Sequence, residues 1–377
     1  MELTGLADTY REFYAPCYVV RIRGTDLMRE LAVAVSQVEV DLQLGTASHF
    51  SFTATDCYSQ KRHIFQSGSG DDLLKTITFG AEVEVYMGYG DIKSAPIAVS
   101  GVITEIATNF PESGSPELSI GGFDHGHPLT TGKHSRTMSD ARDSDFAQKI
   151  ASLNNLKSTI QTSNGQHKKI EQNQESDWEF LKKLADRNHF ELYVDESKTL
   201  HFARPNDKAE AVVRLVYGEG LLSFKPEANI AEQVSRVEVN GWDPMTKKPI
   251  VGVATAGEES GLRGKSGGQE LNGFVVDPDK RPILRIKQPV FTQAEADERA
   301  KAVLNECAKK FLTGQGEAIG LPEIRPDRRV ELANLSVPFS KAYYIQQAIH
   351  KIDSNGYRTT FKVKEPGIDD ANGRGSA

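Results

Sequence analysis

The sequence predicts a mainly β protein with an α+β insert between two β-rich regions. Short alternating strands, separated by turn residues, fill residues 16–124 and return between residues 212 and 363. Between these regions, residues 171–205 carry a helical apolar pattern that changes to strand alternation. At 377 residues the chain is too long for one hydrophobic core, so we expect two or three domains.

The first β-rich region consists of several short strands. Alternation of apolar and polar residues begins at residues 18–22. The apolar register changes between Val35 and Val38, which predicts a β-bulge near Ser36. Further alternating runs cover residues 50–52, 83–87, 99–106 and 118–120. Short strands with turn signals between them indicate a barrel or a sandwich.

The helix and hairpin of residues 171–205 have local causes in the sequence. Ser176 and Glu179 form a predicted capping box, and Asp177 adds negative charge where the helix dipole favours it. After Asn188 the apolar period changes to two, so a strand, a tight turn and a return strand follow. The apolar face of the helix consists of Trp178, Leu181, Leu184 and Ala185, with Phe180 beside it. A shorter helix is predicted over 143–154, with the apolar set Phe146, Ala147, Ile150, Ala151 and Leu153.

A loop and a long helix interrupt the second β-rich region. Residues 254–273 are rich in glycine, serine and charge, a composition that buries too little apolar surface to order itself, so we expect an exposed mobile loop. Thr292 and Glu295 form a second predicted capping box for a helix over 292–312, which Gly314 ends. The predicted strands lie at 212–216, 221–224, 234–239, 317–321, 329–332, 342–352 and 357–363, with a hairpin turn at Asn355-Gly356.

Three blocks of the sequence resemble one known family. The blocks are NQESDWEFLKKLA with the following FELYVD and TLHF, FGAEVEVYMGYGD with VSGVITEI, and AYYIQQAIHKIDSNGYRTTFKV. Together they resemble the phage late control gene D proteins, which are tail hub proteins. This family is similar to the N-terminal part of the valine-glycine repeat spike proteins of type VI secretion and to the hubs of phage-like contractile injection systems. Family members often have glycine where this chain has Pro326-Asp327-Arg328, which leaves the turn type open.

The resemblance implies a particular domain arrangement. Two tube-like β-barrel domains are expected at residues 1–127 and 209–366, the second of which carries the mobile loop and the long helix. An α+β helix/hairpin domain is expected at residues 128–208. A disordered tail is expected at residues 367–377.

The resemblance also implies a structural role in assembly. The chain would be a homotrimeric hub in which six barrels surround a central channel and join a sixfold tail tube to a threefold spike. A closed trimer would also pair exposed barrel edges without forming fibres. The residues of the interface between subunits are unknown from the sequence.

The expected partners and location follow from this role. The partners are a tail tube or tube-adaptor protein, other baseplate proteins and a spike. We expect the spike to be a separate polypeptide, because the sequence stops in a polar tail. Such a hub would be made and assembled in the bacterial cytoplasm and become part of the baseplate of a virion or of an extracellular phage-like particle.

Composition and charge argue against several other classes of partner. The formal net charge of −7 argues against a nucleic-acid-binding face, which needs clustered basic residues. No apolar run approaches the roughly 20 residues of a membrane span, and the first residues lack the apolar core of a signal peptide. Cys17, Cys57 and Cys307 have no CxxC spacing, so we expect small apolar residues rather than a zinc site or a disulfide framework.

One histidine-containing segment is a candidate metal site. The segment DHGH at residues 124–127, followed by His134, combines ligand types that bind zinc at short spacing. Its glycine and the following Pro128 indicate a turn, so a polar linker between two domains is the favoured interpretation. We therefore expect no metal and no cofactor.

No pattern in the sequence selects a catalytic group. The segment GKS at residues 264–266 lacks the upstream glycine of a phosphate-binding loop, because Glu259 stands there. Acidic pairs at residues 71–72 and 258–259 lie in predicted loops, where solvation explains them. The sequence has no nucleophile elbow, zinc-protease motif or catalytic-cysteine signature. We therefore expect no enzymatic activity.

Two other classes of function stay open. A baseplate-associated peptidoglycan hydrolase would need a carboxyl group beside an apolar patch, which would raise its pKa. A carbohydrate-binding module would use exposed aromatic side chains, and Trp242, Tyr89 and Tyr343 are the candidates. Packing in a core or at a subunit interface is the favoured interpretation of these three side chains.

Overall fold

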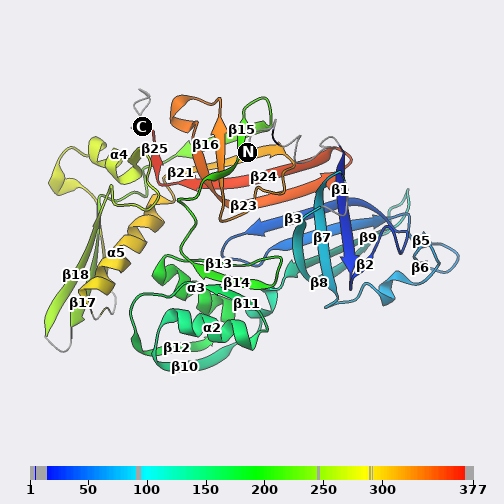
Figure 1. Cartoon of the computed structure of the whole chain (residues 1–377), viewed down its shortest axis with the longest axis horizontal. Coiled ribbons are helices and arrows are strands. Elements are labelled where there is room, and N and C mark those ends of the chain that lie inside the picture. The colour runs from blue at the N-terminus through cyan, green and yellow to red at the C-terminus, as the bar shows by residue number, and fades with distance from the viewer. Residues whose placement is uncertain are drawn as a thin grey trace.

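The computed structural model is mostly β and confirms the predicted fold class. Figure 1 shows one strand-rich part in blue and cyan and another in orange and red, with an α+β part below and a helix-on-sheet part at the left. Each part has its own cluster of buried apolar side chains. The structure describes residues 5, 15–90, 95–243, 247–287, 290 and 292–369.

The first half is a curled antiparallel sheet. Its elements are β1 (Pro16–Ile22), β2 (Thr25–Asp26), β3 (Ala34–Gln43), β4 (His49–Thr55), β5 (Tyr58–Ser59), β6 (Ile64–Phe65), η1 (Leu73–Lys75), β7 (Glu82–Tyr89), β8 (Ile97–Asn109) and β9 (Glu117–Asp124). The ladder between β3 and β4 shifts between Val35 and Gln37, which confirms the bulge predicted near Ser36. Because of the bulge, Val35 and Val38 both point into the core.

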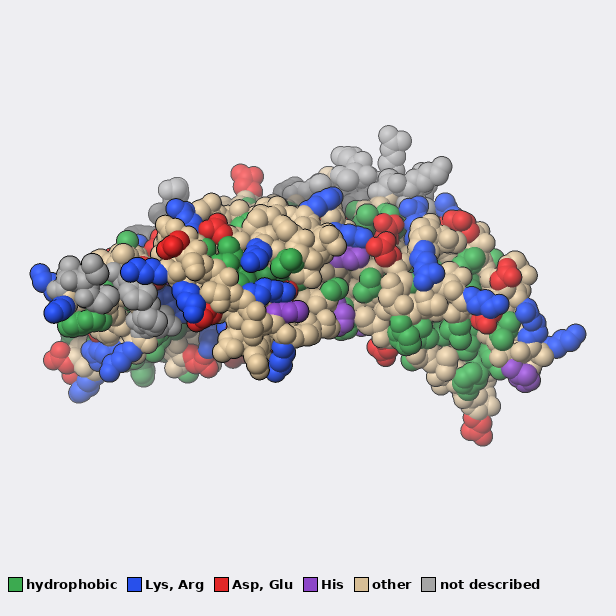
Figure 2. All heavy atoms as spheres, turned by 90° about the horizontal axis from the view of Figure 1, so that it is seen from below, with side chains coloured by type: hydrophobic (Ala, Val, Ile, Leu, Met, Phe, Trp, Pro, Cys, Tyr) green, Lys and Arg blue, Asp and Glu red, His purple; other side chains and the backbone are tan. Residues whose placement is uncertain are grey.

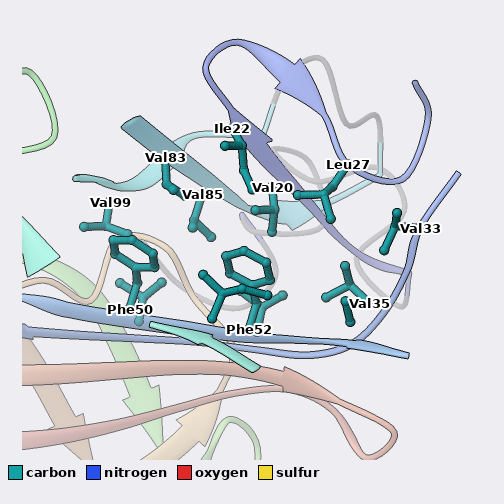
Figure 3. Close-up of a cluster of buried hydrophobic side chains, with 14 of the residues drawn as sticks. Val20, Ile22, Leu27, Val33, Val35, Phe50, Phe52, Val83, Val85 and Val99 are labelled. Atoms are coloured by element: carbon teal, nitrogen blue, oxygen red, sulfur yellow. The ribbon is translucent and has the colours of Figure 1, made fainter. Parts of the chain in front are cut away.

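One apolar core fills the curled sheet of the first half. In Figure 3 the side chains of β1 and β7 point toward Phe50 and Phe52 on the facing part of the sheet. Both rings are almost fully buried. The curl therefore lets a single sheet cover two sides of its core.

The α+β part follows the first half in the chain. Its elements are η3 (His127–Thr130), β10 (His134–Ala141), α2 (Asp143–Leu153), β11 (Lys157–Ile160), β12 (His167–Glu175), α3 (Asp177–Asn188), β13 (Glu191–Val194) and β14 (Thr199–Ala203). Ser176 Oγ accepts the Glu179 amide at 3.1 Å, and the Glu179 carboxylate accepts the Ser176 amide at 2.9 Å, which confirms the predicted capping box. Helix α3 ends at Asn188, and His189 after it caps the helix in the left-handed conformation at φ 54°.

The predicted apolar face of α2 is right with one exception. Phe146, Ala147, Ile150 and Ala151 are buried, but Leu153 is 55% exposed at the end of the helix. The sequence also gives no sign of β10 and β12, which pair with each other. Their residues are mostly polar because one face of this two-stranded sheet is exposed to solvent.

The helix-on-sheet part is inserted into the second half. Its elements are β17 (Arg236–Asp243), β18 (Lys248–Thr255), β19 (Lys265–Ser266), α4 (Gly267–Phe274), η4 (Pro278–Lys280), β20 (Ile283–Lys287) and α5 (Gln293–Ala308). Helix α5 covers one face of the sheet β18-β17-β20. A Cβ on Gly252 would lie 2.1 Å from the Ala296 backbone, so glycine is required for this close approach.

The prediction of a structureless loop over 254–273 is wrong. Residues 267–274 form α4, which begins at a capping box of Ser266 and Gln269. Leu271 on this helix is buried. The glycine-rich composition conceals the helix because Gly267 and Gly268 lie against neighbouring side chains and backbone that leave no room for a Cβ.

The predicted end of the long helix is also wrong. Thr292 Oγ1 accepts the Glu295 amide at 3.2 Å and caps α5 as expected. The helix stops at Ala308, however, and not at residue 312. Phe311 and Leu312 instead enter the core of the second half, and their burial there outweighs continued helix formation.

The second half contains the remaining strands. Its elements are β15 (Ala211–Val216), β16 (Leu221–Ala228), β21 (Leu312–Ile319), β22 (Arg329–Ala333), η5 (Val337–Phe339), β23 (Ala342–Asp353), β24 (Gly356–Glu365) and β25 (Gly367–Ile368). The predicted hairpin joins β23 to β24, with Asp353 opposite Gly356. The predicted tail at 367–377 is wrong at its start, because β25 pairs with β19. The rest of that prediction, residues 370–377, lies outside the described residues, as do residues 1–4 and 6–14 of the predicted first domain.

A single sheet runs through both halves. Its strand order is β16-β21-β24-β23-β3-β4-β9-β8-β7-β1-β2, and β15 and β22 join it at β23. The ladder between β23 and β3, here named the internal joint, is antiparallel and extends from Gln347 opposite Gln43 to Ile352 opposite Val38. Ile352 and Tyr357 of the second half belong to the apolar core of the first. The two halves therefore share a backbone ladder and part of a core.

Hydrogen bonds from Arg325 connect three parts of the molecule. Its guanidinium donates to the carbonyls of Ile97 at 3.1 Å and Ala98 at 3.2 Å in the first half. It also donates to the Glu196 carboxylate of the α+β part at 2.6 Å. The α+β part makes a further contact with the first half through Trp178 Nε1, which donates to the Gly45 carbonyl at 3.1 Å.

Asp327 lies in the turn of residues 326–328, within which the resembling family often has glycine. Its φ of 60° lies in the left-handed region, which aspartate tolerates better than most residues. The carboxylate accepts the Asn206 amide at 2.8 Å, the Tyr344 hydroxyl at 2.8 Å and the Tyr193 hydroxyl at 3.4 Å. Hydrogen bonds from three other segments thus hold a strained turn in place.

A buried ion pair joins β22 to the end of β24 in the second half. Arg329 and Glu365 are 1% and 2% exposed, and their side chains approach to 3.0 Å. Arg329 also donates to the Ala342 carbonyl at 2.7 Å, and Glu365 accepts the Tyr344 amide at 3.0 Å. Burial raises the pKa of Glu365 to about 7, and the Arg329 guanidinium opposes that rise.

His350, a residue of the internal joint, is a second buried polar group. Its Nε2 lies 2.9 Å from the Ile324 carbonyl, and its Nδ1 lies 2.9 Å from the Tyr357 hydroxyl. This arrangement places the ring proton on Nε2. Burial, together with the nearby Arg325 charge, lowers the pKa of His350 to about 3.

The Arg329→Met variant should lower the free energy of unfolding of the second half by about 3–5 kcal/mol, because it leaves Glu365 buried without its partner. The double variant Arg329→Met with Glu365→Leu should lose less. The exposed pair of Arg358 and Glu317 is a matched control, and Arg358→Met should cost less than about 1 kcal/mol. Denaturant unfolding followed by circular dichroism measures all three. Equal losses for Arg329→Met and Arg358→Met would contradict the assigned burial.

Protonation of His350 should destabilise the folded protein in acid. The unfolded histidine takes up a proton below its ordinary pKa of 6.5, whereas the folded one does not until about 3. Its contribution to stability is therefore complete above pH 6.5 and declines as the pH falls from 6.5 toward 3. Unfolding midpoints of the wild type and of His350→Gln, measured over this range, should converge as the pH falls. Parallel pH profiles for the two proteins would show that His350 does not titrate on unfolding.

Candidate assembly interface

The two halves repeat one strand arrangement. Their main strands in chain order are β1, β3, β4, β7, β8 and β9 in the first half, and β15, β16, β21, β22, β23 and β24 in the second. When the six strands of each half are numbered in chain order, their order across the sheet is second, third, sixth, fifth, fourth, first in both halves. Neighbouring strands of this order are antiparallel, except for β15 and β22, which are parallel. The chain therefore contains two units with the same strand order, which differ in the direction of their first strand.

The repeat extends to the register of single residues. The ladder of the second strand has a bulge at Ser36 in the first half and at Leu222 in the second. The ladder of the fifth strand has a bulge at Thr104 in the first half and at Gln346 in the second. When the halves are aligned on these bulges, the ladders that link the second, third, sixth and fifth strands keep the same register throughout.

The equivalent strands differ in what they pair with. In the second half, the latter part of the fifth strand, β23, pairs with β3 in the internal joint. In the first half, β7 pairs with residues 97–102 of the fifth strand, β8, and no described strand covers that edge at residues 105–109. The second strand of the second half, β16, is the end strand of the sheet. Open strand edges of this kind bind further strands.

Large exposed apolar side chains lie at both open edges. Phe110, directly after β8, is 59% exposed, and Leu222 of β16 is 41% exposed. The open part of β8 itself is exposed at four of its five residues. Both open edges therefore present an apolar side chain beside unpaired backbone groups.

The two halves differ most at one end of the sheet. There, residues 44–48 connect the second and third strands of the first half, whereas residues 229–311, with the helix-on-sheet part, connect them in the second. The sixth strand of the first half leads into the α+β part at the same end, because the ends of β9 and β24 pair with the starts of β4 and β21. At the opposite end, the turns 110–116 and 354–355 join the fifth and sixth strands in both halves.

The histidine-containing segment builds a turn. The buried Asp124 carboxylate accepts the amides of Ser48 at 2.7 Å and Gly126 at 2.8 Å. Burial raises the pKa of Asp124 to about 6, against the effect of these hydrogen bonds. The carboxylate therefore fixes the end of β9 against the loop between β3 and β4.

The histidines of this segment point to separate neighbours. His125 Nε2 lies 3.1 Å from Ser100 Oγ, the His127 ring stacks on Phe123, and His134 is the first residue of β10. Among the described residues, no group of three or more His, Cys, Asp or Glu side chains is placed to hold a metal. The described residues also contain no helix that is long and apolar enough to cross a bilayer.

The segment GKS at residues 264–266 forms the junction between β19 and α4. Ser266 Oγ accepts the Gln269 amide at 3.3 Å as the cap of α4. Lys265 lies 4.0 Å from the Glu270 carboxylate. These side chains are thus engaged in local structure.

The two acidic pairs also have local structural roles. The Asp72 carboxylate accepts the Leu74 amide at 3.0 Å and caps η1. Glu258 and Glu259 accept the amides of Thr255 at 3.0 Å and Gly257 at 2.6 Å. Both pairs therefore stabilise turns.

The three aromatic candidates lie in different environments. Tyr89 and Tyr343 are buried, and their hydroxyls donate to the carbonyls of Gly320 at 2.8 Å and Phe339 at 3.0 Å. Trp242 is 55% exposed on β17. A carbohydrate site built from all three would therefore be impossible.

The cysteines behave as small side chains of the structure. Cys57 is buried, Cys17 and Cys307 are half-buried, and none of the three forms a disulfide. Burial raises the pKa of Cys57 and Cys307 above the ordinary value of a thiol.

A cleft of about 1830 Å³ separates the α+β part from the helix-on-sheet part. Charged side chains of both signs line it, and several are paired, such as Asp143 with Arg187 and Glu175 with Lys183. Figure 2 shows basic and acidic side chains interspersed over the face seen from below. The cleft therefore presents neutralised charge and not a concentrated field of one sign.

The sequence does not reveal the repeat, which is the main feature of the candidate interface. Equivalent positions carry unlike residues, such as Val38 and Phe224 or Ile106 and Ala348. The one available signal was the predicted bulge near Ser36, because a matching bulge in another strand would have suggested equivalence. The repeat becomes evident only from the backbone pairing of the strands.

Comparison with solved structures shows that the fold is shared with tail proteins. The prophage MuSo2 43 kDa tail protein from Shewanella oneidensis has a TM-score of 0.69 at 15% identity, covering 94% of this chain and 100% of that chain. A tail protein from Neisseria meningitidis has a TM-score of 0.66 at 16% identity, covering 94% and 98%. The E. coli c3393 protein, described as a component of the type VI secretion system, has a TM-score of 0.56 at 11% identity, covering 95% and 79%. The resemblance to tail hub proteins is thus confirmed at the level of the fold.

Sequence comparisons give one family and no close relative. No curated protein matches the chain significantly. The profile of the family described as Alg8 N-terminal domain matches residues 16–354. Because this match covers most of the sequence, the protein belongs to the Alg8 N-terminal domain family.

Proposed function

We propose that this protein is the structural hub of a contractile tail or phage-like injection particle, acting as a trimeric adaptor between a sixfold tail tube and a threefold spike. The observation that carries the proposal is the repeat of one six-strand unit within a single continuous sheet. Three copies of such a chain present six similar units while keeping threefold symmetry. That is the geometry an adaptor between the two symmetries requires.

Ring closure follows from the type of contact in the internal joint. The fifth strand of one unit pairs there with the second strand of the other, so the two partners use different surfaces. A contact of this head-to-tail kind generates a closed ring when the rotation between units divides a full turn evenly. With two units in each chain, a trimer closes a ring of six units around a central channel.

The two ends of the ring suit different partners. At the end with the turns 110–116 and 354–355, both units join their fifth and sixth strands, so a trimer offers this connection six times, in two lengths, to a tail tube or tube adaptor. The other end carries the α+β part and the helix-on-sheet part once in each chain. It therefore offers three sites to a spike and to other baseplate proteins.

The described relatives agree with this role. Two of the similar structures are described as tail proteins, one of them from a prophage, and the E. coli protein is described as structurally similar to the T4 tail proteins gp27 and gp5. In this proposal the chain works through extended surfaces and carries no catalytic residue. Its place is the baseplate of a virion or of a phage-like particle.

The purified full chain should assemble into a particle of three copies. Native mass spectrometry should give the trimer mass, and negative-stain images should show a ring with a central hole. Addition of the spike protein encoded beside this chain should stabilise the same trimer. A chain that stays monomeric both alone and with that spike would contradict the hub.

The same sample tests the alternative functions. Clearing of peptidoglycan in a zymogram would favour a hydrolase, with the hub proposal then restricted to assembly. Glycan binding by the monomer that Trp242→Ala abolishes would favour a carbohydrate-binding module. Trp178→Ala is unsuitable as a control because that ring is buried, whereas the exposed Phe274 (77%) allows Phe274→Ala as a matched surface change.

A further inference from the structure

Two open strand edges of this chain match the two edges that form its own internal joint. Residues 105–110, the latter part of β8 with Phe110, are equivalent to β23 residues 347–352. Residues 224–229, in and directly after β16, are equivalent to β3 residues 38–43. Residues 347–352 and 38–43 pair with each other within the chain. Residues 105–110 and 224–229 have no partner strand at these edges among the described residues.

We propose that residues 105–110 of one copy pair antiparallel with residues 224–229 of the next copy, in the register of the internal joint. The occupant of each open edge is thus a second copy of this chain. The inference rests on the proposed trimer and specifies the strands and the register by which it closes. Three internal joints and three joints between chains then complete the ring.

The internal joint fixes the pairing between chains. Within the chain, Gln347 lies opposite Gln43 and Ile352 lies opposite Val38. The corresponding pairs between chains are Glu105 with Asn229, Ile106 with Ala228, Ala107 with Glu227, Thr108 with Pro226, Asn109 with Lys225, and Phe110 with Phe224. Successive pairs alternate between the core face and the outer face of the sheet.

Phe110 supplies the apolar contact of this interface. Its equivalent in the internal joint, Ile352, is 5% exposed and belongs to the core of the neighbouring unit. In the single chain Phe110 is 59% exposed, although its ring approaches Tyr58 and Phe65. Pairing with the next copy would place it opposite Phe224, at the edge of the second unit's core. Assembly would then bury a side chain whose exposure the single chain leaves unexplained.

Pro226 makes the β16 edge selective. Leu44 donates its amide to the Gln346 carbonyl across the internal joint at 3.2 Å, so alternate residues of β3, including Val40, direct their amides toward β23. Pro226 is equivalent to Val40 and has no N–H, which removes one donor from the outward ladder. Proline on an edge strand discourages pairing with arbitrary strands. Stable pairing therefore depends on the added side-chain contact of Phe110.

One pair of charges makes the joint between chains weaker than the internal one. In the internal joint, Gln347 Nε2 donates to Asp41 Oδ1 at 2.7 Å. The equivalent side chains between chains are Glu105 and Glu227, two carboxylates that repel each other. A weaker joint suits subunits that fold separately and then assemble. Glu105→Gln would restore the amide–carboxylate pair of the internal joint.

Disulfide cross-linking tests the proposed register in the full chain. Ala107 and Glu227 form a pair whose backbone groups point away from the partner strand, and the Cβ atoms of such pairs lie about 4.5–5.5 Å apart. The variant carrying Ala107→Cys and Glu227→Cys should give covalent dimers and trimers under mild oxidation on a non-reducing gel. The variant carrying Ala107→Cys and Ser223→Cys, shifted by four residues, should give none above the wild-type background.

A matched control tests the same geometry inside the chain. Ile349 and Asp41 are the equivalents of Ala107 and Glu227 in the internal joint. The variant carrying Ile349→Cys and Asp41→Cys should form an intramolecular disulfide under the same oxidation. Its formation shows that the conditions suffice to link a correctly paired position.

Each outcome separates the joint from the hub. A trimer by mass that lacks the 107–227 cross-link, or that cross-links equally at 107–223, would overturn the proposed joint and leave the hub standing. A monomer without cross-links would overturn both. Cross-links at 107–227 alone, in a particle of three chains, support both.

Two further variants move assembly in opposite directions. Glu105→Gln should lower the concentration at which half the chains assemble by about two- to fivefold, since it removes a cross-strand repulsion. Phe110→Ser should raise that concentration by about tenfold or more, since it removes the buried ring. Phe274, 77% exposed at the end of α4 in the helix-on-sheet part, provides the control Phe274→Ser, which should change nothing. Tighter assembly of Glu105→Gln cannot result from misfolding, and no change in either variant would contradict the joint.

Discussion

The backbone ladder between β3 and β23 is the constraint on which the rest of this structure depends. It joins segments about 300 residues apart in the chain, so its formation carries a large entropic cost of loop closure. The ladder offsets this cost by giving the two halves a shared core, into which Ile352 and Tyr357 project. It also covers two strand edges that would otherwise be open to aggregation. The α+β part and the helix-on-sheet part are attached to a frame that this ladder holds.

Buried polar groups near the ladder fix how the parts meet. Arg325 reaches backbone carbonyls in one half and a carboxylate in the α+β part, and His350 is held between a carbonyl and a tyrosine hydroxyl. Each group loses its hydrogen bonds to water on burial. Hydrogen bonds within the protein replace them only when all of its partners are in position. A displaced half would leave these groups unsatisfied. The polar contacts therefore select one relative arrangement, while the apolar cores supply most of the stability.

A repeated unit with unequal additions accounts for the proposed adaptor without any catalytic group. In the proposed ring, repetition would give sixfold character, and the parts present once in each chain would reduce it to threefold symmetry at one end. The repeat also accounts for the open strand edges. Each edge that forms the internal joint has an equivalent edge that can form the proposed joint between chains. The proline and the acidic residue at the equivalent β16 edge weaken that joint. In the proposed assembly, such weakening would keep the separate subunit from pairing before it meets the correct partner.

Local features of this protein were determined by the sequence itself. Alternation placed most strands, Ser176 and Glu179 defined the start of α3, and the changed register before Val38 placed the bulge. These depend on interactions between near neighbours, whose spacing can be read along the chain. The end of α5, helix α4 and the pairing of β10 with β12 could not be read in this way, because distant segments supply the burial or the missing hydrogen bonds. The internal joint and the repeat were decided only by tertiary structure, since register between strands depends on backbone pairing and unlike side chains can fill equivalent positions.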